Sequence, residues 1–456
     1  MKYKVWMSIL LSISLLAGCS LPLGSEEKTT VEKEEETLGL TPDFSYEVVE
    51  QTPNILINQI GYLTENNKIA ILQGNQLENV FYVYQAQSNA LEYVGELMFQ
   101  SLGVTQDKKS AKDIYLADFS HIKTPGRYYL YHPKLGYSYE FEIKNDIYDN
   151  VEKKILSLLG EEKKDTSLIC YQLAGLLLTK ELYPEAVLQP ERLDRICREK
   201  VELLLKAQDE TTGNVYADIS KADILMDEIQ KQQFVSLAAT AEFAGVMANY
   251  AFQIREKELN LSYQYQMAAE KAYDGIRNSL DNVGYDAGYF AATQLYRLTG
   301  RTKYAQAIGQ YLTMNEEQKR YTEYDFSLFG DYAYLTLRYG SNLEWSDFIM
   351  KRIMKQAETI SRSSGKNNFY VSDKREYNDI DGKLRDMSNL ALVNYIITNH
   401  EYSVLQQNYL DYFLGRNPDN ICYIDGFGTR NAGEDEAKIQ DKNGSLFYLL
   451  LQGTKL

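Results

Sequence analysis

Carboxylates are the side chains of this chain that are best suited to chemistry. Asp286 stands in "VGYDAGYFAATQLYRLTG" (283–300), and Asp386, Asp425 and Glu436 are further candidates. A carboxylate can take a proton from water, and a nearby carboxylic acid can give one to a leaving group. These acids are therefore the candidate catalytic or ligand-binding groups.

Histidine and cysteine offer no ligand set for a metal. The chain has no Cys-x-x-Cys, and its few histidines are scattered at His121, His132 and His400. We expect no zinc site and no cofactor. Cys170 and Cys197 lie in apolar helical contexts that favour buried thiols, although outside the cell the two could also pair.

The first nineteen residues predict an export signal. Lys2 and Lys4 precede an apolar run, residues 5–17, which is shorter than the roughly 20 residues needed to span a bilayer. The run ends in Leu-Ala-Gly-Cys, so Cys19 is the expected site of lipid attachment. An extracytoplasmic lipoprotein anchored to the membrane is predicted, and an ordinary signal peptide with an incidental cysteine is the alternative.

Residues 20–50 predict a disordered acidic tether. Nine acidic residues against Lys28 and Lys33 give −7 of the formal charge of −16. Such a segment buries too little apolar surface to offset the entropy of ordering it. With no basic patch elsewhere, a nucleic-acid partner is not expected.

The remaining chain changes its hydrophobic period once. Short β-branched and aromatic runs separated by turn residues fill residues 54–144, which predicts a β-sandwich of six to eight strands. From Ile147 onward, apolar residues recur at three- and four-residue spacing, which predicts ten to twelve helices joined by short connections. Gly300 after "LYRLT" is the expected C-cap of one of them. We divide the folded part into a sandwich over 51–145 and a helical domain over 146–456.

Several segments that follow one another in a defined order point to one protein family. "NQIGY" (58–62) and "DFSHIKTPGRYYL" (118–130) lie in the sandwich, and the helical part contains "VSLAATAEFAGVMANYAF", "FAATQLYRLTGRTKYAQA", "DMSNLALVNYIITN" and "LDYFLGRNPDNICYIDGFGTRN". Together they resemble the immunoglobulin-like domain and catalytic domain of cellulases of glycoside hydrolase family nine. The resemblance implies a β-sandwich (Ig-like) followed by an all-α (α/α)6 barrel with a cleft for a β-linked glucan. An unrelated helical array behind a β-domain is the alternative.

The segment that carries the catalytic base in that family is missing where it should stand. The family's Asp-Ala-Gly-Asp loop follows the sandwich, but the corresponding interval here is "SLLGEEKKDTSLICYQLAG" (157–175), in which Asp165 is the only Asp. "YDAG" at 285–288 comes too late in the chain, after the Ala-Thr-Ala-Glu-Phe-Ala helix. Asp286 is therefore expected at the start of a helix, where a carboxylate suits the exposed N–H groups.

The carboxyl-terminal segments of the family's active site are also reduced. The family's His-His-Arg segment is absent from "TRNAGEDEAKIQDKNGSLFYLLLQ" (429–452), and Glu436 is one residue out of the spacing expected for the general acid. Glu436 is either a displaced relic of that acid or a surface residue among other acids. The resemblance further suggests substrate-binding roles for Tyr285, Asp286, Asp386, Asn389 and Arg416. Some of the 38 tyrosines are also expected to stack on sugar rings.

Three functions follow from this pattern. An inverting glycosidase needs a base and an acid on opposite sides of the scissile bond. Loss of the base loop therefore favours a catalytically degenerate protein that binds a β-glucan or another envelope polysaccharide. The alternatives are a divergent active glycoside hydrolase that recruits Glu436, Asp286, Asp386 or Asp425, and a scaffold that binds a partner protein.

Overall fold

The computed structural model describes residues 52–102, 112–222, 224, 232–277, 283–372, 379–433 and 437–455. The expected signal peptide with Cys19, the expected tether over 20–50, and Glu436 lie outside these residues. Within them, no helix has the length and apolarity needed to cross a bilayer.

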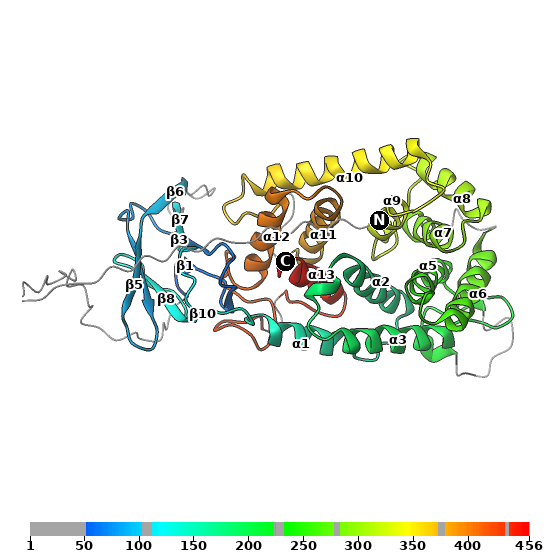
Figure 1. Cartoon of the computed structure of the whole chain (residues 1–456), viewed down its shortest axis with the longest axis horizontal. Helices are drawn as coiled ribbons and strands as arrows, with labels where there is room; N and C mark the ends of the chain where they lie inside the picture. The colour runs from blue at the N-terminus through cyan, green and yellow to red at the C-terminus, as the bar shows by residue number, and fades with distance from the viewer. Residues whose placement is uncertain are drawn as a thin grey trace, which may run out of the picture. The chain divides into compact units, whose positions relative to one another are not determined.

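Strands occupy the amino-terminal part of the described chain (Figure 1). Their bounds are β1 Ile55–Leu56, β2 Gly61–Tyr62, β3 Ile69–Gln73, β4 Phe81–Gln85, β5 Leu91–Gly95, β6 Leu97–Ser101, β7 Ile114–Asp118, β8 Gly126–His132, β9 Gly136–Tyr137 and β10 Phe141–Ile143.

The strands form two sheets. Among the described residues, one sheet has the order β1-β3-β7-β6 and the other β2-β10-β8-β4-β5, with β9 added to β8. The pairs are antiparallel except β10 with β2, in which Glu142 lies opposite Gly61. Ten described strands exceed the expected six to eight, because β1, β2 and β9 are two-residue strands too short to show alternation.

The sheets enclose their own apolar core. In β4, Phe81 and Val83 are fully buried, as period-two alternation requires. The Tyr62 ring lies edge-on to Phe119 and Phe141, with centroids 5.4 and 5.5 Å away. The predicted sandwich is therefore present, with aromatic pairs at its centre.

Helices form the rest of the described chain (Figure 1). Their bounds are α1 Asp149–Leu159, α2 Thr166–Leu182, α3 Pro190–Lys206, α5 Leu237–Ile254, α6 Leu259–Ile276, α7 Tyr285–Thr299, α8 Thr302–Thr313, α9 Ser327–Leu335, α10 Leu343–Ser364, α11 Ile380–Ile397, α12 His400–Phe413 and α13 Gly444–Gly453.

Burial separates the helices into two classes. In α2, α5, α7, α9, α11 and α13, most positions are buried, as in a helix surrounded by protein on every side. In α3 and α10, only a stripe is buried; in α10 it runs through Ile349, Ile353, Ala357 and Ile360. Amphipathic helices thus cover apolar ones.

The buried helices contact one another in a closed order. α2 contacts α5, α5 contacts α7, α7 contacts α9, α9 contacts α11, α11 contacts α13, and α13 contacts α2 again. The close approach of α5 and α7 uses small residues: a Cβ on Gly245 would lie 2.3 Å from the Phe290 ring. The alanine-rich runs 238–241 and 291–293 lie in these two helices.

Local signals fix where the helices begin and end. The Asp165 carboxylate accepts the Leu168 N–H and caps α2, and the Ser236 hydroxyl accepts the Ala239 N–H and caps α5. Gly300 ends α7 with φ of 66°, and its N–H donates to the Tyr296 carbonyl. The predicted C-cap at Gly300 and the predicted helix start at Asp286 are both confirmed.

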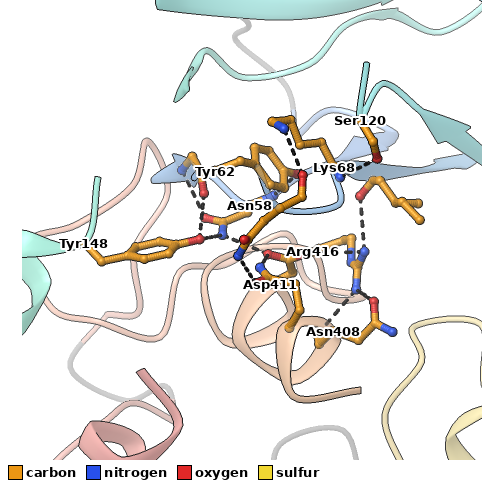
Figure 2. A network of polar contacts seen from close by, with 12 residues as sticks. Asn58, Tyr62, Lys68, Ser120, Tyr148, Asn408, Asp411 and Arg416 are labelled. Carbon is orange, nitrogen blue, oxygen red and sulfur yellow. Dashed lines mark hydrogen bonds and ion pairs between the residues drawn. The ribbon is translucent and has the colours of Figure 1, made fainter. Parts of the chain in front are cut away.

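A buried polar network joins the first strands to α12 (Figure 2). The Asn58 amide donates to the Tyr148 hydroxyl at 3.1 Å and to the Asp411 carboxylate at 3.0 Å. Asp411 also pairs with Arg416 at 3.4 Å, and the Arg416 guanidinium donates to the Ile69 carbonyl and the Asn408 amide oxygen. The sandwich and the helices therefore share one network of hydrogen bonds.

Candidate functional site

One cavity of about 1090 Å³ opens where α2, α5 and α7 begin. Its wall includes Asp165 and Ser167 near the start of α2, Ala238 and Glu242 in α5, and the segment 314–324. We call it the Glu242 cavity. Because three helices start around it, several side chains at widely separated positions in the sequence face one space.

A second cavity of about 440 Å³ lies beside the first. We call it the Asn389 cavity, and its lining includes residues of α9, α10 and α11 together with Leu446 of α13. Tyr285, Tyr321 and Thr322 line both cavities, so these residues form the shared wall. The two spaces together run past the starts of α2, α5, α7, α9 and α13.

Tyrosines contribute much of the cavity walls. Tyr311 and Tyr324 line the Glu242 cavity, Tyr171 lines the Asn389 cavity, and Tyr285 and Tyr321 line both. Tyr321 is 51% exposed and its ring packs edge-on against Tyr285 at 5.6 Å. An amphipathic ring offers both an apolar face and a hydroxyl, which are the two features that a sugar ring can use.

Glu242 is the unusual acid of the first cavity. Its side chain is fully buried, and neither carboxylate oxygen has a hydrogen-bond partner among the described residues. Burial raises its pKa to about 8; the Asp286 and Asp165 charges also raise it, while the nearby Ser167 and Thr322 hydroxyls lower it. At neutral pH Glu242 is therefore mostly a neutral carboxylic acid.

Asp286 holds the wall between the cavities in place. Its carboxylate accepts the Thr322 N–H at 2.7 Å, the Thr322 hydroxyl at 2.5 Å and the Phe326 N–H at 2.9 Å. It is fully buried, and burial raises its pKa in spite of these three bonds. Asp286 lines neither cavity, so its carboxylate positions the 322–326 segment.

A partly buried ion pair lines the Asn389 cavity. Arg352 pairs with Asp331 and donates to the Tyr285 hydroxyl, and the Tyr289 hydroxyl donates to Asp331 at 3.0 Å. Burial raises the pKa of Asp331, while the Arg352 charge lowers it. Asn389 of α11 lines the same cavity, and its amide oxygen is buried with no hydrogen-bond partner among the described residues.

Comparison with known families agrees with this architecture. Residues 50–136 match the cellulase N-terminal Ig-like domain, and residues 160–434 match glycosyl hydrolase family 9. The chain belongs to glycosyl hydrolase family 9. The resemblance seen in the sequence is therefore confirmed: this family 9 chain has an Ig-like domain followed by a helical domain.

Distant relatives of this family 9 chain are endoglucanases. A xyloglucan-specific endo-β-1,4-glucanase from Bacteroides ovatus is 21% identical, over 83% of this chain and 81% of the relative. Endoglucanase D from Acetivibrio thermocellus is 22% identical, over 82% and 73%. Among solved structures, a metagenome-derived family 9 endoglucanase has a TM-score of 0.71 at 18% identity, covering 88% of this chain and 99% of that one. At such identities the structural likeness shows the fold.

The structure brings together only some of the residues expected to bind substrate. Tyr285 and Asn389 line cavities, and Asp286 lies just behind their shared wall. Asp386 is buried in α11 and lines neither cavity. Arg416 is 1% exposed in the network beneath the sandwich, where its side chain is out of reach of a polysaccharide.

The other acids named from the sequence do not gather at the cavities either. Asp425 is exposed and lies 3.5 Å from Lys154. Glu436 is outside the described residues, so both interpretations, a displaced relic of the acid and a surface residue, stay predictions. Cys170, Cys197 and Cys422 are buried free thiols, which answers the open question of a Cys170–Cys197 pair in favour of thiols.

Sequence interpretation missed Glu242, Asp331 and Arg352. Glu242 carried a usable signal, because a lone acid in the apolar small-residue run "LAATAEFAGVMA" must be buried or face a cavity. Asp331 and Arg352 carried no such signal in the sequence, because their ion pair joins α9 to α10 through tertiary contact alone. Within the described ranges, no group of three or more His, Cys, Asp and Glu side chains could hold a metal ion.

Proposed function

We propose that this chain is a polysaccharide-binding member of family 9 that has lost hydrolytic activity and is held outside the cell membrane by a lipid on Cys19. The connection between α1 and α2 carries this proposal. α1 ends at Leu159 and α2 begins at Thr166, so little chain is available where the resemblance places the base loop.

The one aspartate of that connection already has a structural task. Asp165 is the N-cap of α2, and its carboxylate accepts the Leu168 N–H at 2.9 Å. An inverting hydrolase needs an ionised base that holds a water molecule opposite the acid, with roughly 6.5–9.5 Å between the two carboxyl groups. A helix cap on a short connection is a poor substitute for such a base.

Binding is supported by the tyrosine-rich cavities. The Glu242 and Asn389 cavities share a wall of Tyr285, Tyr321 and Thr322, which gives a chain of sugar rings two adjacent spaces. The relatives named as a xyloglucan-specific glucanase and an endoglucanase make a β-glucan or a similar polysaccharide the first class of ligand to test. We further propose that the closed order of α2, α5, α7, α9, α11 and α13 is the inner wall of an (α/α)6 barrel.

The test uses the full chain in detergent with xyloglucan, mixed-linkage β-glucan and chitooligosaccharides. Retention in affinity electrophoresis without release of reducing ends is expected. Tyr321→Ala should weaken retention severalfold, because Tyr321 lines both cavities, whereas Tyr339→Ala, at a residue that is 89% exposed and lines neither, should not. Reducing ends released by the wild-type chain would refute the loss of activity, and no retention of any glycan would refute binding.

A divergent hydrolase is the second candidate, and one observation favours it. Asp165 and Glu242 line the same cavity, and the buried acid has a raised pKa while the exposed one has an open path to water. A buried carboxylic acid and an exposed carboxyl group on one cavity are typical of an acid–base pair. This candidate requires turnover that both Asp165→Asn and Glu242→Gln abolish.

A further inference from the structure

The Glu242 carboxyl group is buried at a cavity, where the Ser167 and Thr322 hydroxyls approach it without completing a hydrogen bond. Both oxygens lack hydrogen bonds among the described residues, and the side chain has no exposed surface. Leaving a buried polar group without a hydrogen bond destabilises the protein, and more so when the group is charged. Because Glu242 lines the Glu242 cavity, a ligand there can supply the missing hydrogen bonds.

The charges around this cavity select the kind of ligand. Asp165, Glu317 and Glu323 line it with Glu242, and Arg320 is the one cationic side chain among its described lining residues. The neighbouring Asn389 cavity is different, since its acids are matched by Lys319, Arg352 and Arg385. Lys442 lies 3.6 Å from Glu323, and even with that pair the first cavity has more carboxyl groups than cations, which favours a cationic ligand.

We propose that the Glu242 cavity binds a sugar that carries a primary ammonium group, a de-N-acetylated hexosamine within a glycan, and that the Glu242 carboxylate is its counter-ion. The inference rests on the proposed function, since it names the class of sugar that this cavity takes. The ammonium donates to the two oxygens of Glu242, and the remaining ring packs against the tyrosines of the wall.

Binding of the ammonium changes the protonation of Glu242. The free protein holds Glu242 as a neutral acid, because burial and the nearby Asp165 and Asp286 disfavour its charge. Cys170 and Tyr324 also lie near it, and burial raises the pKa of both, so both stay neutral and add no charge beside Glu242. The ammonium supplies a positive charge, and the Glu242 proton leaves to solvent as the ion pair forms.

Calorimetry of the full chain tests this at about pH 6, where both the amine and Glu242 carry their protons. A chitosan tetrasaccharide is compared with its fully N-acetylated counterpart and with cellotetraose, in two buffers of different ionisation enthalpy. The amino sugar is expected to bind about tenfold or more tightly than the others, and to release close to one proton. Neutral sugars should release none.

Glu242→Gln keeps the shape of the side chain and removes its charge. This variant should lose about tenfold or more in affinity for the chitosan tetrasaccharide and all of the proton release, with little change for cellotetraose. Glu344→Gln, at an exposed residue in the first turn of α10, is the matched control and should change neither. A thermal melt of each variant checks that it is folded.

The outcomes separate this inference from the proposed function. Equal binding of cellotetraose and the amino sugar would overturn the ammonium site and leave polysaccharide binding intact. Preferential binding of the amino sugar that survives Glu242→Gln would overturn the role of Glu242. No binding of any oligosaccharide would overturn the ammonium site, and it would overturn polysaccharide binding as well only if none of the glycans of the electrophoresis test is retained.

Discussion

The Asn58 side-chain amide donates to the Asp411 carboxylate at 3.0 Å, and this bond joins the start of the sandwich to α12. Asp411 is 1% exposed and is paired with the equally buried Arg416. Burial raises the pKa of Asp411 while the Arg416 charge lowers it. The acid thus neutralises a buried guanidinium at the junction of the two domains.

Replacing Asp411 by alanine is expected to lower the free energy of unfolding by about 3–5 kcal/mol, because it leaves the Arg416 charge buried without a counter-ion. Urea denaturation followed by tryptophan or tyrosine fluorescence measures the change. Asp347→Ala is the control, since its exposed pair with Lys351 should contribute under about 1 kcal/mol. A loss for Asp411→Ala as small as that of the control would contradict a structural role for the pair.

Asp286→Ala is expected to loosen the wall between the two cavities. It removes the acceptor of the Thr322 and Phe326 N–H groups, and a lost charge-assisted bond costs about 1.5–3 kcal/mol. Hydrogen exchange should accelerate at these two amides far more than at the Leu168 amide, which Asp165 caps. Unchanged exchange at both amides would mean that the segment is held by other contacts.

The order of the elements along the chain could be predicted from the sequence, but the closed order of contacts among the buried helices could not. Hydrophobic period separated the sandwich from the helices, and Gly300 and Asp286 marked the ends of α7, because these signals are local. The contact of α13 with α2 joins residues far apart in the chain, and no local pattern specifies it. The two-residue strands, such as β9, could not be predicted for a different reason: they are too short to show a hydrophobic period.

The site was harder to predict because burial decides the role of each polar residue. Arg416 and Asn389 both stood in segments that resemble the family, yet Arg416 lies in the domain junction and Asn389 at a cavity. A sequence shows that both are polar but not which one a neighbouring element covers. Glu242 owes its raised pKa to that same covering, so its importance emerges from the packing of α5 against α2 and α7.

Gly288→Ala is expected to destabilise the protein by about 1–3 kcal/mol, although alanine is the better helix former. A Cβ at this position in α7 would lie 1.9 Å from the Tyr311 hydroxyl oxygen and 2.4 Å from the adjacent ring carbon. Tyr311 lines the Glu242 cavity, so its ring must move and ligand affinity should fall with stability. Gly426→Ala is the control: its φ of 78° disfavours alanine through the backbone alone, with no atom within 4 Å of the added carbon, so ligand affinity should not change.

Glu242 makes the protein less stable as the pH rises, whereas a salt-bridged acid makes a protein more stable as the pH rises. Its folded pKa of about 8 exceeds the ordinary value of 4.5, so the folded state holds this proton more tightly than the unfolded state does. Raising the pH from about 4.5 to about 8 therefore favours unfolding, by at most about 1.4 kcal/mol per pH unit. Below pH 4.5 and above pH 8, Glu242 adds nothing to the change of the free energy of unfolding with pH.

Glu242→Gln removes that slope, so the variant should gain stability relative to the wild-type chain as the pH rises through this window. Other buried acids, such as Asp331, titrate equally in both proteins and cancel in the difference. Urea unfolding at half-unit steps of pH measures the difference, and Glu344→Gln should show none, because Glu344 is exposed. Parallel curves for wild type and Glu242→Gln would place the Glu242 pKa near its ordinary value, and they would remove the neutral acid on which the expected proton release depends.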